Sequence, residues 1–410
     1  MKFFYQTGIL FYTVLIRFAS LFSDKARFFV KGRKEWETML KSKVEKDARY
    51  LWFHCASLGE FEQGRPVIEE VKARLPEYKI VLTFFSPSGY EIRKNYDGAD
   101  IILYLPVDTK SNAKTFINIL KPEKAFFIKY EFWYFYINEL KNQHIPLYIF
   151  SAIFRENQHF FSNTPWGKWY RKTLFKFEHF FVQNENSAQL LKNTGLTNIS
   201  VSGDTRFDRV AAISKAAKKI QIVEKFKQNY LLIVAGSTWK PDEELITEFI
   251  NQSNNIKFII APHEVTDSNI NRIHQLLKKR AISFSQAEES TIDKYEVLII
   301  DSIGLLSSLY QYGNIAYIGG GFGIGIHNTL EAATFGMPIV FGPNYKRFKE
   351  AVDLISKGGA FSITSYSELK QIFDQFSDKD YLEKTSEISK NYVAKNVGST
   401  KFIIKKVFNI

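Results

Sequence analysis

Short apolar runs alternate with amphipathic stretches from residue 50 to about residue 363. The runs are rich in β-branched and aromatic residues, while the intervening stretches repeat their apolar positions at helical spacing. This alternation predicts parallel sheets with helices on both faces. The predicted strands of the first half are 50–56, 79–85, 101–105, 124–128, 146–150, 179–182 and 199–201. Those of the second half are 230–235, 257–261, 297–300, 315–318, 338–341 and 360–363.

A segment without a strand pattern, residues 209–229, separates the two series and is rich in Ala and Lys. We interpret it as a helical linker region. The fold class predicted is α/β, with two Rossmann-like doubly wound domains facing a cleft, as in GT-B glycosyltransferases, although other two-domain α/β enzymes share the pattern. The predicted parts are an N-terminal segment 1–35, an N-terminal domain 36–208, a C-terminal domain 230–380 and a helical segment 381–410.

The N-terminal segment is apolar and aromatic from residue 8 to residue 22, interrupted by Arg17. Its uninterrupted run is shorter than the roughly 20 residues of a membrane span, and no small-residue cleavage site follows it. We expect a helix that lies in or on a membrane, with the basic residues 25–34 facing anionic headgroups. The alternative is a helix packed on the first domain.

The net charge and the aromatic content indicate what kind of partner the protein binds. The 410 residues carry a net charge of +12, and 16% of them are aromatic. Residues 1–50 hold 11 Lys and Arg against five acids, a net of +6. Because the excess charge accompanies the apolar N-terminus and no nucleic-acid-binding signature is present, a membrane partner is favoured over nucleic acid. The single cysteine, Cys55, excludes an internal disulfide and favours a cytoplasmic setting.

Glu60 follows the first predicted strand in the sequence Ser57-Leu58-Gly59-Glu60. Ser-x-x-Glu is a capping box, in which the Glu side chain accepts from a backbone amide. The same position also places a carboxylate at the carboxyl edge of the sheet, where it can take a proton from a hydroxyl. From spacing alone, the cap is the favoured reading.

Two glycine-containing turns are candidate anion sites. Residues 319–325 (GGGFGIG) follow a strand and lead to a helix, whose N-terminus offers backbone N–H groups to a phosphate. Gly236, Ser237 and Thr238 also follow a strand directly. The alternatives are a flexible turn and a helix cap, and no G-x-G-x-x-G is present to indicate a dinucleotide.

Two aromatic segments stand out. Residues 126–136 hold eight aromatics around the lone acid Glu131, whose pKa would be raised by burial. Residues 154–177 mix aromatics with Arg and Lys, which suits either a surface for a phosphorylated lipid or ordinary packing.

Several catalytic motifs are absent. The chain has no Walker P-loop, H-E-x-x-H or G-x-S-x-G, and its one D-x-D, residues 378–380, follows no predicted strand. We therefore expect chemistry without a metal or other cofactor.

Seven pieces of the sequence, in order, resemble motifs of the bacterial 3-deoxy-D-manno-octulosonic acid (Kdo) transferases, and the likeness runs to about residue 361. The pieces are His54 to Glu60 (H-x-x-S-x-G-E), Glu131-Phe132-Trp133, Gly203 to Asp208, Ala235 to Thr238, Asp301 to Leu306, His327 to Glu331, and Gly342-Pro343.

The resemblance implies an inverting GT-B enzyme that transfers Kdo from CMP-Kdo to a lipid A precursor of the lipid IVA type, at the cytoplasmic face of the inner membrane. It makes Glu60 the expected general base and assigns transition-state stabilisation to Glu131 and Arg206. The residues it implies for CMP binding are Pro262, His263, Ile303, Gly304, Leu305, Asn328, Thr329, Leu330 and Glu331.

The chain departs from the family pattern at four places. Lys129 replaces an acid, Arg206 replaces a Lys, Pro262-His263-Glu264 stands where the family has P-R-H, and Leu305 replaces a Glu. Arg206 keeps the charge but not the geometry of Lys. Two alternatives stay open: a GT-B transferase with another nucleotide-sugar donor, and a non-catalytic membrane-binding protein on the same scaffold.

Overall fold

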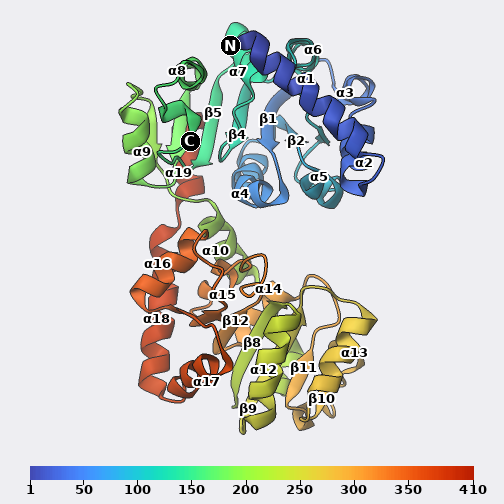
Figure 1. Ribbon diagram of the computed structural model, residues 1–410, viewed down its shortest axis with the longest axis vertical. Coiled ribbons are helices and arrows are strands. Elements are labelled where there is room, and N and C mark those ends of the chain that lie inside the picture. Colours follow the sequence, from blue (N-terminus) through green and yellow to red (C-terminus); the bar gives the residue numbers. More distant parts are fainter. The chain divides into compact units, whose positions relative to one another are not determined.

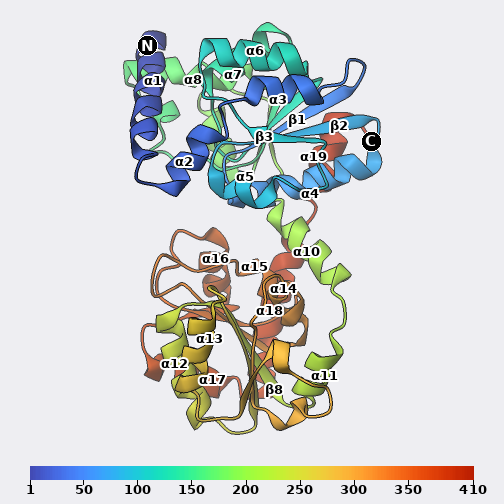
Figure 2. The ribbon, with the colours of Figure 1, turned by 90° about the vertical axis from the view of Figure 1, so that its right-hand side faces the viewer.

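The computed structural model describes all 410 residues and divides into two compact units (Figures 1 and 2). The first unit comprises Met1–Arg209 and Val397–Ile410, and the second comprises Val210–Asn396. Each unit is built around one seven-stranded sheet in which all strands run parallel. The predicted α/β class with two doubly wound domains is therefore confirmed.

The sheet of the first unit has the strand order β3-β2-β1-β4-β5-β6-β7. All seven predicted strands are present, within two residues at each end. Their bounds are β1 Arg49–Cys55, β2 Tyr78–Phe84, β3 Ile101–Tyr104, β4 Lys124–Ile128, β5 Leu147–Ala152, β6 His179–Val182 and β7 Ile199–Val201.

Helices cover both faces of this sheet because the strand residues alternate between two apolar cores. In β1, Leu51 and Phe53 face one core, and Tyr50 and Trp52 face the other. The first core is closed by α4 (Leu58–Arg74), α5 (Pro87–Arg93) and α19 (Ser399–Phe408). The second is closed by α3 (Trp36–Lys43), α6 (Lys110–Leu120), α7 (Tyr134–Asn142) and α9 (Glu185–Lys192), with α8 (Pro165–Arg171) nearby.

The strands β1 and β4 are neighbours, yet the helices that follow them lie on opposite faces of the sheet. The chain after β1 enters α4, and the chain after β4 enters α7. Such a switch point opens a crevice at the carboxyl edge, which is where ligands bind in doubly wound folds.

The N-terminal segment forms α1 (Lys2–Ala19) and α2 (Asp24–Lys31), shown in dark blue in Figure 1. Only a narrow stripe of α1 is partly covered, at Tyr5, Ile9, Thr13, Ile16 and Ala19. The remaining apolar side chains of α1 are exposed: Phe3, Phe4, Leu10, Phe11, Val14, Leu15 and Phe18. No helix of the structure combines the length and the apolar character needed to cross a bilayer.

The sheet of the second unit has the order β10-β11-β9-β8-β12-β13-β14, with its own switch point between β8 and β12. The strands are β8 Leu231–Thr238, β9 Ile256–Pro262, β10 Ala281–Ser283, β11 Val297–Ile299, β12 Ile315–Ile318, β13 Ile339–Phe341 and β14 Ala360–Ser362. The sequence did not predict β10, because this edge strand has only three residues and its first two are half-buried.

Nine helices accompany the second series of strands. They are α10 Arg206–Ala216, which crosses from the first unit, α11 Gln221–Lys227, α12 Lys240–Gln252, α13 Asp267–Leu276, α14 Leu306–Leu309, α15 Leu330–Ala333, α16 Lys349–Lys357, α17 Tyr366–Gln375 and α18 Lys379–Asn396. The expected linker region is helical in α10 and α11. The expected helical segment 381–410 consists of two helices, of which α18 belongs to the second unit and α19 to the first.

Candidate active site

Glu60 lies in the first turn of α4, directly after β1, and its side chain is buried. One carboxylate oxygen, Oε2, accepts from the backbone N–H groups of Ala56 at 2.6 Å and Ser57 at 3.1 Å. The capping interaction is therefore present. It occupies Oε2 only and leaves Oε1 without a hydrogen-bond partner, so capping and proton transfer are compatible in one side chain.

The surroundings of Glu60 make it a stronger base than an ordinary carboxylate. Burial, followed by the negative charge of Glu131, raises the pKa of Glu60 to about 8. Lys129 and the two backbone N–H groups act in the opposite direction. A carboxyl group with a pKa near 8 is well matched to general base catalysis near neutral pH.

Glu131 lies in the loop between β4 and α7, with a side chain only 12% exposed. Its Oε2 is 3.4 Å from Nε2 of the wholly buried His54. Glu131 also lines a pocket of about 600 Å³ whose other walls include Tyr5, Trp133 and Tyr170. The pocket joins an acidic side chain to aromatic rings and to helix α1.

The two aromatic segments mostly pack inside the first unit. In 126–136, Phe126, Phe127, Phe132, Phe135 and Tyr136 are buried. In 154–177, the rings of Trp166, Trp169 and Tyr170 gather around Tyr5 of α1. Ordinary packing therefore explains most of these rings, and they hold α1 against the unit.

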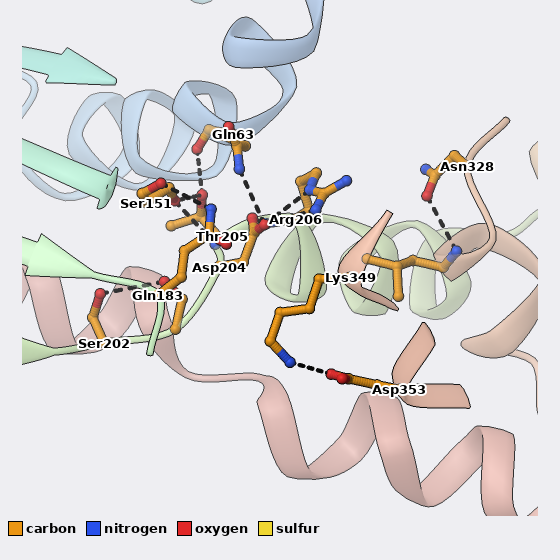
Figure 3. Close-up of polar contacts among 12 residues, drawn as sticks. Gln63, Ser151, Gln183, Ser202, Asp204, Thr205, Arg206, Asn328, Lys349 and Asp353 are labelled. Carbon is orange, nitrogen blue, oxygen red and sulfur yellow. Dashed lines mark hydrogen bonds and ion pairs between the residues drawn. The ribbon is translucent and has the colours of Figure 1, made fainter. Parts of the chain in front are cut away.

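Arg206 begins α10 and is held by Asp204 (Figure 3). The Asp204 carboxylate accepts from the Arg206 backbone N–H at 2.9 Å, from Nε at 3.0 Å and from Nη2 at 2.8 Å. Gln63 of α4 donates to the same carboxylate at 3.0 Å. Because Asp204 is buried, this charge-assisted contact fixes the direction of the guanidinium.

In the second unit, the predicted donor-site residues follow the carboxyl ends of four strands. Gly236, Ser237 and Thr238 end β8, and Pro262 ends β9. Residues 303–305 follow β11, and residues 328–331 follow β12. The structure therefore gathers them at one edge of the sheet.

The end of β8 is strained at that edge. Ser237 has a φ of +54°, within a bulge where the register between β8 and β9 shifts. Gly319 lies against the Ser237 carbonyl oxygen, leaving no room for a side chain. Sites of this kind are often functional. The cap of α12 lies one residue further along, because the N-cap residue is Trp239 and its N–H donates to Asp242 at 2.9 Å.

Three rings stack beside this bulge. The His263 ring stacks on Trp239 at 4.5 Å between centroids and is tilted against His327 at 4.6 Å. Trp239 Nε1 donates to His327 Nε2 at 3.2 Å. Burial, and then the neighbouring His263, lowers the pKa of His327 to about 4, so this ring is neutral at pH 7.

The loops after β11 and β12 are joined by Glu331. Its carboxylate accepts from Ser307 at 2.6 Å and from Asn328 at 3.0 Å. The buried Thr329 hydroxyl has no hydrogen-bond partner, and Ile303 is 91% exposed. An unpaired hydroxyl and an exposed apolar side chain at one sheet edge are consistent with a ligand site.

The glycine-rich turn 319–325 was expected to lead to a helix whose N-terminus could bind a phosphate, and the structure differs in the length of that helix. The helix that follows it, α15, has only four residues, so the expected dipole at its N-terminus is small. The turn itself needs glycine, because Gly320 has a φ of +89° and Gly325 a φ of +123°. The buried Asp242 carboxylate accepts from the Gly320 N–H at 2.9 Å.

Several residues of the two sites were not singled out from the sequence. The sequence analysis named His54 only as the first residue of a motif. It assigned no role to Gln63, Asp204, Trp239 or His327. Gln63 is 141 residues from its partner Asp204, so no local signal could reveal that pair. Nowhere does the structure cluster three or more His, Cys, Asp or Glu side chains as a metal site.

Comparisons with known proteins agree with this arrangement. Residues 29–209 match the family model described as 3-deoxy-D-manno-octulosonic-acid transferase (kdotransferase). The 3-deoxy-D-manno-octulosonic acid transferase of Aquifex aeolicus (strain VF5) is 28% identical over 84% of this chain and 92% of its own length.

Solved structures support the fold alone. UDP-GlcNAc 2-epimerase from Neisseria meningitidis, bound to UDP-GlcNAc, matches with a TM-score of 0.63 at 18% identity, over 88% of this chain and all of the epimerase. MurG from Acinetobacter baumannii matches with a TM-score of 0.56 at 11% identity, over 88% of this chain and all of MurG. These neighbours establish the GT-B architecture.

Proposed function

We propose that this chain transfers Kdo from CMP-Kdo to a lipid A precursor of the lipid IVA type, with inversion at the anomeric carbon. Its similarity to Kdo transferases, in the family model over residues 29–209 and in a relative over 84% of the chain, supports this proposal. The observation that carries this proposal is the pair formed by the buried Glu60 and the mostly covered Glu131 at the switch point of the first sheet. A carboxyl with a pKa near 8 and one unoccupied oxygen fits the task of activating a sugar hydroxyl.

In the proposed reaction, the acceptor hydroxyl oxygen attacks the anomeric carbon of Kdo from the face opposite CMP. The new carbon–oxygen bond forms as the bond to the CMP phosphate breaks, and CMP leaves with the bonding electron pair. Glu60 Oε1 takes the hydroxyl proton. A single displacement of this kind inverts the anomeric centre.

Arg206 and Glu131 would act on the charges that develop. The Arg206 guanidinium, oriented by Asp204, would neutralise charge on the departing phosphate. The Glu131 carboxylate would stabilise positive charge at the sugar ring. Our proposal assigns no metal and no other cofactor to the reaction.

The second unit would bind the CMP part of the donor. We assign this role to Pro262, His263, Ile303 to Leu305 and Asn328 to Glu331, and possible phosphate contacts to Gly236 to Thr238. Their common position at the carboxyl ends of β8, β9, β11 and β12 supports the assignment.

We place the reaction at the cytoplasmic face of the bacterial inner membrane, on an anionic lipid surface and without nucleic acid as a partner. The exposed apolar side chains of α1 support this proposal, since an uncovered apolar face on a helix marks an interaction site. Of the basic residues in 25–34, Lys25, Arg27, Lys31 and Lys34 are exposed and would face anionic headgroups. Arg33 differs from this expectation, because it is buried and its guanidinium donates to the Leu105 and Phe85 carbonyls.

The deciding experiment incubates purified protein with CMP-Kdo and a lipid A precursor in detergent or vesicles. We expect CMP release and a product whose mass increases by whole Kdo units. Absence of turnover would contradict the proposal, and thermal shifts with CMP, UDP and GDP would then show whether another donor is used. Binding of none of the three nucleotides would favour a non-catalytic role.

The variant Glu60→Gln distinguishes the proposed role of Glu60 as a general base from its role as a helix cap. Gln keeps an oxygen that can accept from the Ala56 and Ser57 N–H groups, but it cannot take a proton. We expect a loss of kcat of roughly 10²–10⁴-fold, with CMP binding and melting temperature retained. If the variant kept its activity and lost stability, Glu60 would be a cap only.

A further inference from the structure

A cavity of about 650 Å³ lies between the second half of α1, helices α2 and α3, and the residues that lead into α6 (Figure 1). Its volume is within the range of roughly 300–1,000 Å³ that is usual for small-molecule sites. It shares no lining residue with the pocket beside Glu131. The reaction proposed above therefore leaves this cavity without a role.

The walls of the cavity are mostly apolar. Leu10 and Ile16 come from α1, and the other apolar lining residues are Phe29, Val30, Trp36, Pro106 and Val107. Leu10 is 51% exposed and also belongs to the exposed apolar face of α1. The cavity therefore borders the face through which we propose that the protein meets the membrane. Apolar walls at that place suit an acyl chain.

All charged residues that line the cavity are cations. They are Arg17 at the end of α1, and Arg33 and Lys34 between α2 and α3, and no Asp or Glu is among the lining residues. Arg17 and Lys34 are exposed, whereas Arg33 is only 9% exposed. A cavity lined by three cations and no acid attracts a negatively charged group.

The buried Arg33 has neutral hydrogen-bond partners. Its Nε donates to the Leu105 carbonyl at 2.8 Å, its Nη1 to that of Phe29 at 3.0 Å and its Nη2 to that of Phe85 at 2.6 Å. The guanidinium carbon also lies 3.6 Å from the centroid of the Phe29 ring, in a cation–π contact. Burial lowers the pKa of Arg33 to about 10, so the side chain stays charged at pH 7.

A buried carboxylate in the adjoining loop has other partners. Asp108 lies between two lining residues, but it accepts from the Tyr5 hydroxyl and from backbone N–H groups at the start of α7. A buried charge is normally paired, because its removal from water is costly. The first unit thus supplies no counterion for Arg33, and an external anion would supply one.

We propose that this cavity holds one anionic phospholipid of the membrane, with an acyl chain against the apolar walls and the headgroup phosphate beside Arg17, Arg33 and Lys34. The inference rests on the proposed membrane location and not on Kdo transfer. The lipid would fill the space behind α1, whose own contacts with the unit form only a narrow stripe. It would thereby hold the helix at the membrane surface.

Two other anionic ligands fit the cavity less well. Free phosphate would pair with the cations but would leave the apolar walls uncovered. The lipid acceptor of the proposed reaction must reach Glu60 and Glu131, and the cavity has no lining residue in common with the pocket there. A phospholipid satisfies both the charges and the apolar walls.

The first experiment measures lipid binding to the full-length protein in detergent by native mass spectrometry. The probes are phosphatidylglycerol and phosphatidylcholine with the same acyl chains. We expect one phosphatidylglycerol to be retained per chain, and phosphatidylcholine to bind at least roughly tenfold more weakly, because its headgroup has no net charge. Equal binding of the two lipids, or no retained lipid, would overturn the proposal.

Competition identifies the kind of anion that the cavity takes. Inorganic phosphate at millimolar concentration should not displace phosphatidylglycerol, since it gains nothing from the apolar walls. Displacement by phosphate would show a plain anion site and would overturn the proposal. Preferential retention of a lipid A precursor over phosphatidylglycerol would assign the cavity to the acceptor, with the same consequence.

The variant Thr13→Phe tests the location of the lipid. Thr13 lines the cavity, and its hydroxyl donates only to the Ile9 carbonyl of its own helix. The added ring would occupy the cavity without any change of charge, so we expect phosphatidylglycerol to bind at least roughly tenfold more weakly. Val14→Phe is the matched control, because Val14 is 61% exposed and does not line the cavity. Unchanged binding in Thr13→Phe would overturn the proposal.

A second pair of variants tests the charge and decides the matter if Thr13→Phe does not fold. Lys34→Gln removes an exposed cation that lines the cavity, and Lys31→Gln removes an exposed cation that does not. We expect the affinity for phosphatidylglycerol to fall about fivefold in Lys34→Gln only, the usual contribution of one basic residue near an anionic headgroup. Equal affinities in the two variants would contradict the proposal. None of these measurements uses CMP-Kdo, so a failure of the proposed transfer would be seen separately.

Discussion

Glu60 caps a helix with one carboxylate oxygen, and in the proposed reaction it takes a proton with the other. Its Oε2 caps the start of α4, and its Oε1 remains without a partner. Spacing alone favoured the cap, because Ser-x-x-Glu is a common capping pattern. Burial next to Glu131 is what changes its acidity, and burial is a property of the folded chain.

The raised pKa of Glu60 gives a pH dependence with a definite sign. Below a pH of about 8, Glu60 holds its proton and cannot accept another, so kcat/KM should rise with pH through this value. Lys129 favours the ionised form. In Lys129→Ala we therefore expect the rising limb to move to higher pH, as measured by initial rates from pH 6 to pH 10.

The control for this prediction is Lys141→Ala, which removes an exposed lysine of α7. Its profile should match that of wild type. An unchanged limb in Lys129→Ala would show that Lys129 does not act on the base.

Helix α1 shows how one element can face two environments. Its inner stripe reaches the unit through Tyr5, whose hydroxyl donates to the buried Asp108 at 2.6 Å. Asp108 also accepts from the N–H groups of Phe135 and Tyr136 at the start of α7. Burial raises the pKa of Asp108 to about 6, and these hydrogen bonds oppose the rise. The helix is therefore tied to the same region as the Glu131 pocket.

The exposed apolar face of α1 leads to a prediction about membrane binding. Phe11 and Phe18 are each 64% exposed and lie on that face, so replacing both with Ser should leave the fold intact. We expect the affinity for vesicles containing phosphatidylglycerol to fall at least roughly tenfold, since burying a Phe is worth about 1.5–3 kcal/mol. Vesicle co-sedimentation measures this affinity.

Phe402→Ser is the matched control, because Phe402 is 43% exposed on α19, a helix of the opposite core. It should bind vesicles as wild type does. Equal binding by the double variant of α1 would contradict membrane association through this face.

The elements themselves were largely predictable. Every strand of the first sheet was found from apolar runs, because strands buried on both faces are continuously apolar. The edge strand β10 escaped prediction, since it is short and partly exposed. The contacts among the rings of Trp239, His263 and His327 were not predicted either, because these residues come from three separate loops.

At the scale of the whole molecule, the first unit is built from both ends of the chain. The last helix, α19, adds Ile403, Ile404 and Val407 to the core against α4. Asp208 accepts from the N–H groups of Gly398 at 2.6 Å and Thr400 at 2.8 Å, which fixes the start of this helix. The second unit, by contrast, is one continuous segment.

This connectivity predicts an asymmetric effect of truncation. Deleting residues 397–410 uncovers part of the first core, where each lost aliphatic side chain costs about 1.5–3 kcal/mol. We expect the unfolding transition of the first unit to move to lower temperature in calorimetry, while that of the second unit stays in place. Deleting only Asn409 and Ile410, beyond the helix, should change neither transition. A full deletion that left both transitions unmoved would contradict this role of α19.

The sequence by itself determined the α/β class, the two series of strands and the resemblance to the Kdo transferases, since periodicity and motif spacing are local properties of the chain. It also placed Glu60, Glu131 and the residues proposed to bind the donor just after strands. Only the tertiary structure decided that β1 lies beside β4, so that Glu60, Glu131 and His54 meet, and that α19 returns to the first unit. Strand order and burial arise from pairings between distant segments, and these pairings raise the pKa of Glu60.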